Sequence, residues 1–439
     1  MDKKQRPRSP LQKVAQAVGL ALAVATVLAG CSGSGPGSGS GSGSEKPGEP
    51  IVLEFPSWQA NEPGFDVALK AIVDEFESRH ENAKVNLYFV SHTDYQNAMV
   101  TRLATGKAPD IIPGSQADFV AFAATGQLEP LTDRLKDAGI LDNWRNFIEA
   151  AKWDGEYQAL PMLAQARFLY YNEDMLSEAG IGKAPTTPDE LRAAIDAVSA
   201  LNLDGVATWG ATTTSHPNLF GESNAFVVGI GGGWITDGKW SVTSPKTVEA
   251  LELYRELTKQ APPGNDGGKY RQLFAEGRIA MIHDGNWVQT FLDEVSPPEI
   301  HDKLIAAPTP FASSVAEAGT LLSIPKGSSD ERKELAWDFI SIAAEPKFQA
   351  MWATETGAAP GLEGAVTDEI IAANPIVKIL EHDIAKGLPS LPDNENFKEN
   401  FGEIQQRIID AMMRLQTGDE PTMTILNDLQ SQLESITEL

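Results

Sequence analysis

The first part of the chain alternates short apolar runs with longer segments whose apolar residues recur at helical spacing. Apolar runs at residues 51–55, 84–90 and 110–112 predict strands, and a helical pattern follows each of them. The second of these helices is predicted to open with a capping box at Thr93–Gln96. The repeated order of strand and helix predicts an open α/β sheet whose strands run mainly parallel.

The polar residues that follow the strands are candidate ligand contacts. In an open α/β sheet, the first and third strands usually lie side by side, and a crevice opens at their carboxyl ends. Trp58 and Gln59 follow the first predicted strand, and Gln116 and Asp118 follow the third. A polar residue at this place can instead cap the next helix. Ser115 or Gln116 is the expected cap, which leaves Asp118 as a ligand acceptor.

Residues 153–172 predict a passage between two lobes. A turn at Asp154 and Gly155 precedes an extended segment that contains Pro161, and a second apolar run stops at Asn172, a helix-capping residue. Because proline is rare inside a central strand, we expect the chain to leave one sheet at this proline and to enter another.

Arg167 lies within the second apolar run of this passage. A guanidinium is costly in apolar surroundings unless its donors are used. Arg167 therefore either donates to a ligand or pairs with a carboxylate across the passage, and the sequence leaves both alternatives open.

The second half of the chain repeats the α/β pattern. Helices are predicted to open at Thr187–Glu190 and at Ser244–Pro245, and residues 279–283 predict a strand. Residues 303–324 contain two apolar pieces and are a candidate second crossing. Residues 212–240 are predicted to be rich in loops. The candidate ligand contacts in these loops are Asn218, Glu222, Asn224 and Trp234.

Composition narrows the possible partners. The 439 residues are enough for two or three domains with proper cores. With 35 basic and 61 acidic residues, the chain has a formal net charge of −26, which repels nucleic acid and anionic lipid. We therefore expect no nucleic-acid partner and interpret the acidity as a property of a solvated surface.

The N-terminus differs from the rest of the chain. A basic head precedes an apolar run at residues 14–28, which is short for a membrane span and typical of an export signal. The run ends at Leu28-Ala29-Gly30-Cys31, which resembles the bacterial lipobox, and Cys31 is the only cysteine. Residues 32–44 are almost entirely glycine and serine, as in a flexible tether. We expect a signal peptide at residues 1–30 and an acylated Cys31 with its tether at residues 31–49.

Several segments, in this order, resemble the carbohydrate-type extracellular solute-binding proteins of bacterial ABC importers, the group that contains maltose-binding protein. The matching segments are Thr105–Asp110, Thr125–Leu131, Asp154–Pro161, Tyr171–Leu176, Gly180–Leu191, Phe274–Trp287 and Glu345–Pro360. Most of them are helix caps and turns, so the shared order carries the resemblance. It covers the chain from about residue 51 to 439.

The resemblance implies two α/β lobes that are joined by a hinge of several crossings and that trap a ligand between them. The expected division places residues 50–163 and 320–368 in lobe 1, and residues 164–319 and 369–439 in lobe 2. The expected partners are a carbohydrate and the permease subunits of an ABC importer. The lipobox and tether fit a monomer anchored by lipid to the outer face of a Gram-positive cell membrane.

The resemblance also bears on the site. Gln165 matches a family ligand position, and Trp287 matches an aromatic residue that follows a turn, so Trp287 is expected to stack on a sugar ring. Trp58 and Trp234 lie in predicted loops and are either stacking platforms or core residues. Glutamine stands at position 165 where maltose-binding protein has glutamate, which puts maltose in doubt as the ligand.

Three alternatives remain at this stage. A non-sugar solute such as glycerol-3-phosphate would need several basic residues, of which only Arg167 is evident. A glycosidase would need two carboxylates across the sugar, and Asp118 and Glu222 are the only candidate pair. A tethered adhesion module would bind no small molecule. The six histidines are isolated and no nucleotide-binding glycine loop is evident, so no cofactor or metal is expected. The resemblance to solute-binding proteins implies no enzymatic activity.

Overall fold

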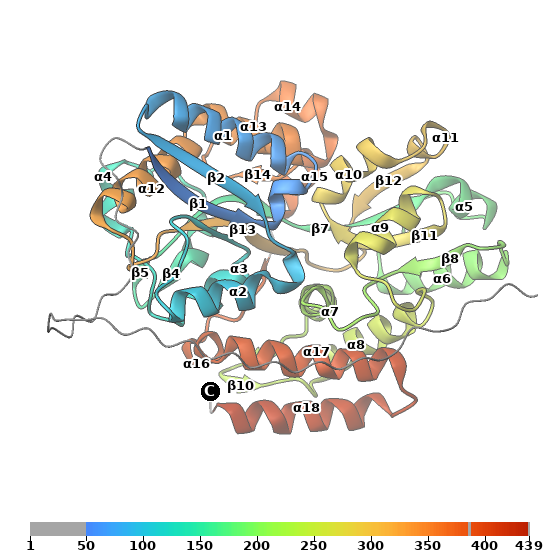
Figure 1. The fold of residues 1–439 in the computed structure, drawn as a ribbon. Coiled ribbons are helices and arrows are strands. Elements are labelled where there is room, and N and C mark those ends of the chain that lie inside the picture. The colour runs from blue at the N-terminus through green and yellow to red at the C-terminus, as the bar shows by residue number, and fades with distance from the viewer. Residues whose placement is uncertain (1–49, 385–387, 438–439) are drawn as a thin grey trace, which may run out of the picture. The chain divides into compact units, whose positions relative to one another are not determined.

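The computed structural model describes residues 50–384 and 388–437 (Figure 1). The predicted signal peptide, Cys31 and the tether lie outside the described residues. Among the helices that the structure describes, none combines the length and the apolar character that a membrane span requires.

The first lobe begins with β1 (Ile51–Ser57), which pairs in parallel with β2 (Ala83–Phe89). The helix between them, α1 (Phe65–Arg79), buries its apolar face, and the ring of Phe76 packs against Phe339, which also contacts Phe55 of β1. The elements up to the first crossing are then η1 (Trp58–Asn61), α2 (His92–Ala104), β3 (Ile112–Gly114), α3 (Gln116–Ala123), α4 (Thr132–Asp137), η2 (Asn146–Ala151), β4 (Lys152–Trp153), β5 (Glu156–Tyr157) and β6 (Leu160–Gln165).

The second lobe is built on a four-stranded sheet with the order β12-β7-β11-β8 (Figure 1). Its elements are β7 (Arg167–Asn172), α5 (Glu173–Glu178), α6 (Pro188–Ala200), β8 (Ala207–Gly210), α7 (Asn218–Gly229), β9 (Ile235–Thr236), β10 (Lys239–Trp240), α8 (Pro245–Thr258), α9 (Gly267–Ala275), β11 (Ile279–Gly285), α10 (Trp287–Val295), α11 (Pro298–His301) and β12 (Leu304–Pro308).

The chain then returns to the first lobe through β13 (Val315–Ser323). This strand joins a five-stranded sheet with the order β14-β6-β13-β15, in which β3 also pairs with β13. The remaining elements are α12 (Asp330–Ala343), α13 (Pro346–Thr356), β14 (Ala359–Pro360), α14 (Asp368–Ala373), α15 (Pro375–Ile384), β15 (Leu388–Pro389), α16 (Glu395–Glu399), α17 (Phe401–Thr417) and α18 (Thr422–Ile436).

The two predicted crossings are present, but the first one is not made at Pro161. Pro161 lies inside β6 and pairs with Leu321 of β13, while its carbonyl accepts a hydrogen bond of 2.9 Å from Trp144 Nε1. The chain changes sheets at Ala166, the single residue between β6 and β7. A proline removes one donor from a sheet and keeps its acceptor, so β6 accommodates it.

The prediction of mainly parallel sheets was wrong. β1–β2, β8–β11 and β13–β15 are parallel, whereas β13 runs antiparallel to β3 and β6, and β7 runs antiparallel to β11 and β12. Apart from the short hairpins β4–β5 and β9–β10, the antiparallel pairs involve the strands that carry the chain between the lobes. These strands enter a sheet from the other lobe and not through a crossover helix, so the rule for βαβ units does not set their direction.

The predicted helix starts are mostly confirmed. The side chains of Ser115, Asn172, Thr187 and Ser244 each accept a hydrogen bond from the first turn of their helices.

The predicted capping box at Thr93 is wrong. The helix α2 begins at His92 with Ser91 at the N-cap position, two residues earlier than predicted, and Thr93 lies in its first turn. The Thr93 hydroxyl contacts His216 instead of the backbone of its own helix.

The predicted loop-rich section at residues 212–240 contains the helix α7. Nine of its residues are buried, including Glu222, Ser223 and Asn224. A helix that is buried on nearly all sides has no continuous polar face, so the apolar residues show no helical period that would reveal it.

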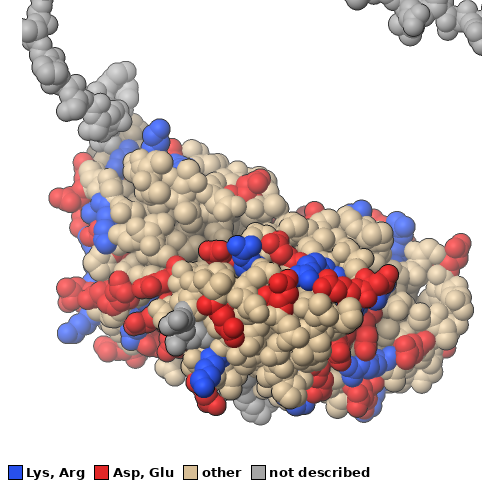
Figure 2. Space-filling model, turned by 90° about the horizontal axis from the view of Figure 1, so that it is seen from below, with Lys and Arg blue, Asp and Glu red and all other residues tan. Residues whose placement is uncertain are grey.

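The C-terminal helices α17 and α18 pack side by side in the lower part of Figure 1. Figure 2 shows the molecule from below, with acidic side chains spread among basic and uncharged ones on this face. On this face the acidic side chains therefore belong to a dispersed, solvated surface.

Candidate functional site

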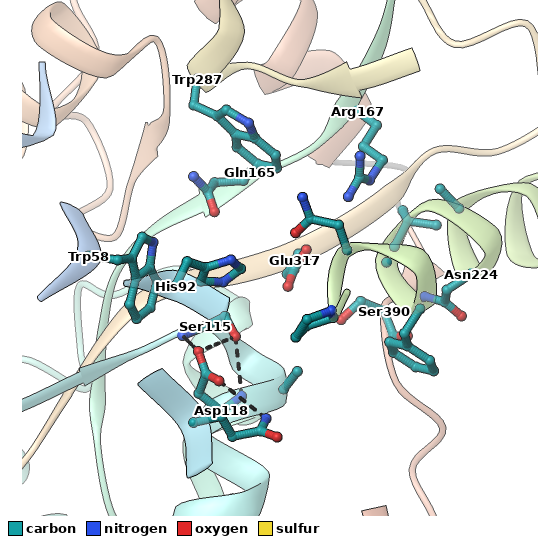
Figure 3. Close-up of a pocket in the computed structure, with 18 of the residues that line it drawn as sticks. Trp58, His92, Ser115, Asp118, Gln165, Arg167, Asn224, Trp287, Glu317 and Ser390 are labelled. Carbon is teal, nitrogen blue, oxygen red and sulfur yellow. Dashed lines mark hydrogen bonds between the residues drawn. The ribbon is translucent and has the colours of Figure 1, made fainter. Parts of the chain in front are cut away.

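A cavity lies where the crossing strands pass between the lobes (Figure 3). Its wall combines aromatic, amide, carboxylate and guanidinium side chains from both lobes. The lining residues are Trp58, Gln59, Glu62, His92, Gln96, Ser115, Ala117, Asp118, Gln165, Arg167, Pro217, Asn218, Phe220, Gly221, Asn224, Ala225, Arg271, Trp287, Val315, Glu317, Thr320, Ser390, Leu391 and Gln405.

The structure brings together eight of the eleven predicted site residues at this cavity: Trp58, Gln59, Asp118, Gln165, Arg167, Asn218, Asn224 and Trp287. They come from η1, α3, the first crossing, α7 and the start of α10. Segments far apart in the sequence therefore converge on one cavity, as the topological argument predicts.

The other three predicted residues do not line the cavity. The Gln116 Oε1 atom accepts hydrogen bonds from Ala318 N and Ser390 Oγ, so its amide ties α3 to β13 and to the segment after β15. Glu222 is buried in α7 and accepts from the Thr212 backbone and hydroxyl. Glu222 does not line the cavity with Asp118, so the glycosidase pair that the sequence suggested is not assembled there.

Trp234 is a core residue in the structure. Only 1% of its surface is exposed, and its Nε1 donates to Asn224 Oδ1 at 2.9 Å. The Asn224 amide also donates to Ser390 O at 2.7 Å, so both ends of its side chain are engaged within the protein. Asn224 thus lines the cavity while holding α7 to the segment after β15.

The two tryptophans that line the cavity differ in exposure. Trp58 is 8% exposed and packs against Tyr95, with ring centroids 4.7 Å apart. Trp287 is only half-buried, and the guanidiniums of Arg167 and Arg271 lie 5.7 and 5.8 Å from its ring centroid. Trp287 is therefore the larger aromatic surface that faces the cavity.

Gly285 determines where the Trp287 ring lies. A Cβ atom on Gly285 would stand 2.2 Å from the six-membered part of that ring. Only glycine at this position lets the ring fold back against β11, because any side chain would occupy the same space.

A fully buried carboxylate organises the charged part of the second-lobe wall. Asp284 accepts two hydrogen bonds from Arg271, at 2.6 and 3.1 Å, and one from the Tyr270 hydroxyl at 2.6 Å. Burial alone would raise the pKa of Asp284, but the adjacent Arg271 guanidinium holds that pKa below its usual value. Asp284 is therefore an ionised anchor behind the cavity wall.

Arg167 pairs with the same carboxylate. Its Nη1 lies 3.5 Å from Asp284 Oδ1, and 14% of its side chain is exposed. The structure thus supports the ion-pair alternative, with the partner on the neighbouring strand β11. Arg167 also lines the cavity, so donors that Asp284 does not engage face the interior.

Three further carboxylates that line the cavity have no ion pairs with the described residues. Ser115 is the N-cap of α3 and Asp118 completes the capping box. The Asp118 Oδ2 accepts from Ser115 N at 3.0 Å and from Ser115 Oγ at 2.7 Å, and its Oδ1 accepts from Gln96. Glu62 and Glu317 have no side-chain hydrogen bond within the described part of the chain. Burial raises the pKa of Glu62 to about 7 and also raises the pKa of Glu317.

A direct contact joins the lobes at the cavity. The His216 Nδ1 atom accepts from Asn218 N at 3.1 Å, so the proton of the neutral ring is on Nε2, which donates to Thr93 Oγ1 at 3.0 Å. Burial lowers the pKa of His216 to about 4 and also lowers the pKa of His92, whose ring lies 5.8 Å away. Both rings are therefore neutral near pH 7.

The sequence argument did not identify several residues that line the cavity: Glu62, His92, Arg271, Glu317, Thr320 and Gln405. Glu317 could have been found, because a carboxylate in the second predicted crossing is the counterpart of Arg167 in the first. Thr320 has a φ of +48°, a strained conformation for a β-branched residue, and no sequence signal reveals it. Within the described residues, no group of three or more candidate ligands is placed to hold a metal ion.

Comparison with known proteins places this geometry in context. A family model described as bacterial extracellular solute-binding protein matches residues 71–379. The chain is 25% identical over 310 residues to the diacetylchitobiose binding protein DasA of Streptomyces coelicolor, covering 66% of this chain and 69% of that protein. It is 23% identical over 336 residues to the maltotriose-binding protein of Pyrococcus abyssi, covering 73% and 69% of the two chains.

Solved structures share the architecture. Maltose-bound MalE3 of T. maritima has a TM-score of 0.78 at 21% identity and covers 88% of this chain and 99% of its own. A chitin oligosaccharide binding protein has a TM-score of 0.75 at 20% identity and covers 89% and 99%. These likenesses confirm the predicted two-lobed binding-protein fold.

Proposed function

The chain belongs to the bacterial extracellular solute-binding proteins, and from this membership we propose that it captures a mono- or oligosaccharide between its lobes and delivers it to an ABC importer. The relatives whose names specify diacetylchitobiose and maltotriose support a sugar as the solute. The chain acts as a receptor and not as an enzyme.

The lining of the cavity is the observation that carries the proposal. A sugar presents hydroxyl groups that need amide, carboxylate and guanidinium partners, and C–H faces that pack on flat aromatic rings. Trp287 supplies such a ring, and Gln165, Asp118 and Arg167 supply the three polar types. We propose the eight predicted residues that line the cavity as the ligand-binding set.

The crossings provide the mechanism of capture. Binding selects the state in which both lobes contact the ligand, since the cavity wall is complete only when they are close. In the division that we propose, residues 50–163 and 320–368 form lobe 1, and residues 164–319 and 369–439 form lobe 2. Two of the three boundaries fall inside β6 and β13, so these joining strands also carry Gln165 and Glu317, and the third falls inside α14.

We further propose that Cys31 carries a lipid after removal of residues 1–30. The receptor would then be a monomer held at the outer face of the membrane by its tether. Labelling cells with a radioactive fatty acid tests this, because Cys31→Ser should abolish the label.

A thermal-shift screen tests the sugar assignment. The full-length protein is mixed with mono- and oligosaccharides, and a binder is expected to raise the melting temperature, since a ligand that binds only the native state stabilises it. Small-angle scattering with the same sugar should show compaction. If no sugar raises the melting temperature or compacts the protein, the assignment to sugars fails.

A further inference from the structure

The positive charges of the cavity are already neutralised by carboxylates behind its wall. Arg271 and Arg167 both contact Asp284, which has no exposed surface. Arg167 also lies close enough to the buried Glu222 to lower the pKa of that carboxyl, which burial raises to about 6. Neither guanidinium therefore offers an unopposed charge to a ligand.

The negative charges in the lining have no such counterparts. Glu62, Asp118 and Glu317 all line the cavity, and none of them forms an ion pair with a described residue. Arg271 and Arg167 act on Glu62 and Glu317 only at a distance, and the pKa values of both carboxyls remain raised by burial. The described wall therefore carries more carboxylates than its two guanidiniums balance.

A second feature is an amide that faces the same cavity. Gln405 of α17 is 6% exposed and lines the cavity, yet its amide has no hydrogen bond within the described residues. The amide atoms are not sealed inside the protein, so they are available to hydrogen-bond to a bound molecule. Gln405 and the two unpaired glutamates line one cavity, and Figure 3 shows Glu317 near its centre.

We infer that the sugar carries a protonated amine, as in a 2-amino-2-deoxy sugar, and that Glu317 and Glu62 hold the ammonium. This inference rests on the proposed function as a sugar receptor. A neutral hydroxyl can donate to these carboxylates but leaves their charge in place, whereas an ammonium donates three hydrogen bonds and neutralises a charge. A phosphate or a carboxylate on the ligand would meet unpaired carboxylates and is excluded by the same argument.

Calorimetry with three matched series tests the inference. The probes are the β-1,4-linked di- and trisaccharides of glucosamine, N-acetylglucosamine and glucose, which differ only in the group at C2. At pH 7 most of the amine is protonated and an adjacent ammonium favours ionised carboxylates, so the full-length protein should bind the glucosamine series at least tenfold more tightly than the other two. Equal or weaker binding of the glucosamine series, with a neutral series binding, would overturn the inference and leave the sugar receptor intact.

Two variants test whether Glu317 and Glu62 cause the preference for the glucosamine series. Glu317→Gln and Glu62→Gln keep the size of each side chain and should each reduce the preference for glucosamine at least fivefold. In each variant, the ratio of its affinity for the glucosamine series to its affinity for a neutral series is insensitive to a general loss of stability. The matched control is Glu178→Gln, an exposed carboxylate on α5 outside the cavity, which should keep the full preference. A preference that survives in both glutamate variants overturns the inference, and failure of every sugar series, together with the wider screen, overturns the proposed function itself.

Discussion

The two sides of the cavity differ in how the protein treats charge. On the side formed by β7, α9 and β11, Arg167 and Arg271 are held by Asp284 and stand beside the ring of Trp287. On the other side, Glu62 and Glu317 have raised pKa values and no hydrogen-bonding partner among the described residues. The charges on the first side are paired within the protein, and the two glutamates on the other side are not.

This difference distinguishes two uses of a buried charge. Buried charges that are paired hold neighbouring side chains in position, and removing one partner leaves the other uncompensated. A buried charge that stays unpaired costs free energy in the unoccupied protein, and such a cost is typical of sites where a ligand supplies the partner. Removing a charge, or moving the Trp287 ring, should therefore have different effects on the two sides.

The largest effect is expected from Asp284→Asn. The change keeps the shape of the side chain and removes its charge, so two poorly exposed guanidiniums lose their common partner. Breaking a buried ion pair in this way costs about 3 kcal/mol of unfolding free energy. Urea denaturation measures the loss. Asp196→Asn, on the exposed side of α6, is the control and should stay within about 0.5 kcal/mol of the parent protein. Equal stabilities of the two variants would show that Asp284 does not anchor this side.

A smaller effect, on affinity, is expected from Gly285→Ala. The added Cβ would lie 2.2 Å from the Trp287 ring, so the ring must leave its place between β11 and the cavity. For the proposed sugar ligand, the dissociation constant should rise at least tenfold, about as much as in Trp287→Ala, because the stacking surface is displaced in both. Gly182→Ala is the control, since a Cβ there meets no atom within 4 Å and the backbone is unstrained. An unchanged affinity in Gly285→Ala would remove Trp287 from the binding set.

Local signals in the sequence predicted most of the elements. The caps at Ser115, Asn172 and Thr187 were found because a single residue type and its spacing suffice to mark a helix start. The sequence placed the first crossing at Pro161, five residues before its actual place at Ala166. A proline shows only that a backbone N–H donor is missing, and not whether the strand needs that donor.

The candidate site was predicted less completely, for a different reason. Residues that follow strands, such as Trp58 and Asp118, are brought to the crevice by topology alone. Arg271 lies in α9 and Gln405 in α17, and both reach the cavity through tertiary packing that no short segment encodes. Glu222 and Trp234 were selected for a loop that is in fact a buried helix and its neighbour, so their side chains are used inside the second lobe.

On the unpaired side, Glu62→Gln should stabilise the protein, in contrast to the loss at Asp284. Burial raises the pKa of Glu62 from 4.5 to about 7 in the folded state, so between these values the folded state binds more protons than the unfolded state. The unfolding free energy therefore falls as the pH rises through this window, and above pH 7 the folded protein holds an ionised, half-buried carboxylate without a partner. Glutamine removes this cost.

The unfolding free energy of the variant should match that of the parent at pH 4.5 and exceed it by about 1 kcal/mol at pH 8, a value reduced because the side chain is only half-buried. Urea denaturation at both pH values measures the difference, and Glu178→Gln should show no such dependence. A variant that is no more stable than the parent at pH 8 would mean that Glu62 is satisfied without a ligand, and the contrast between the two sides would then rest on Glu317 alone.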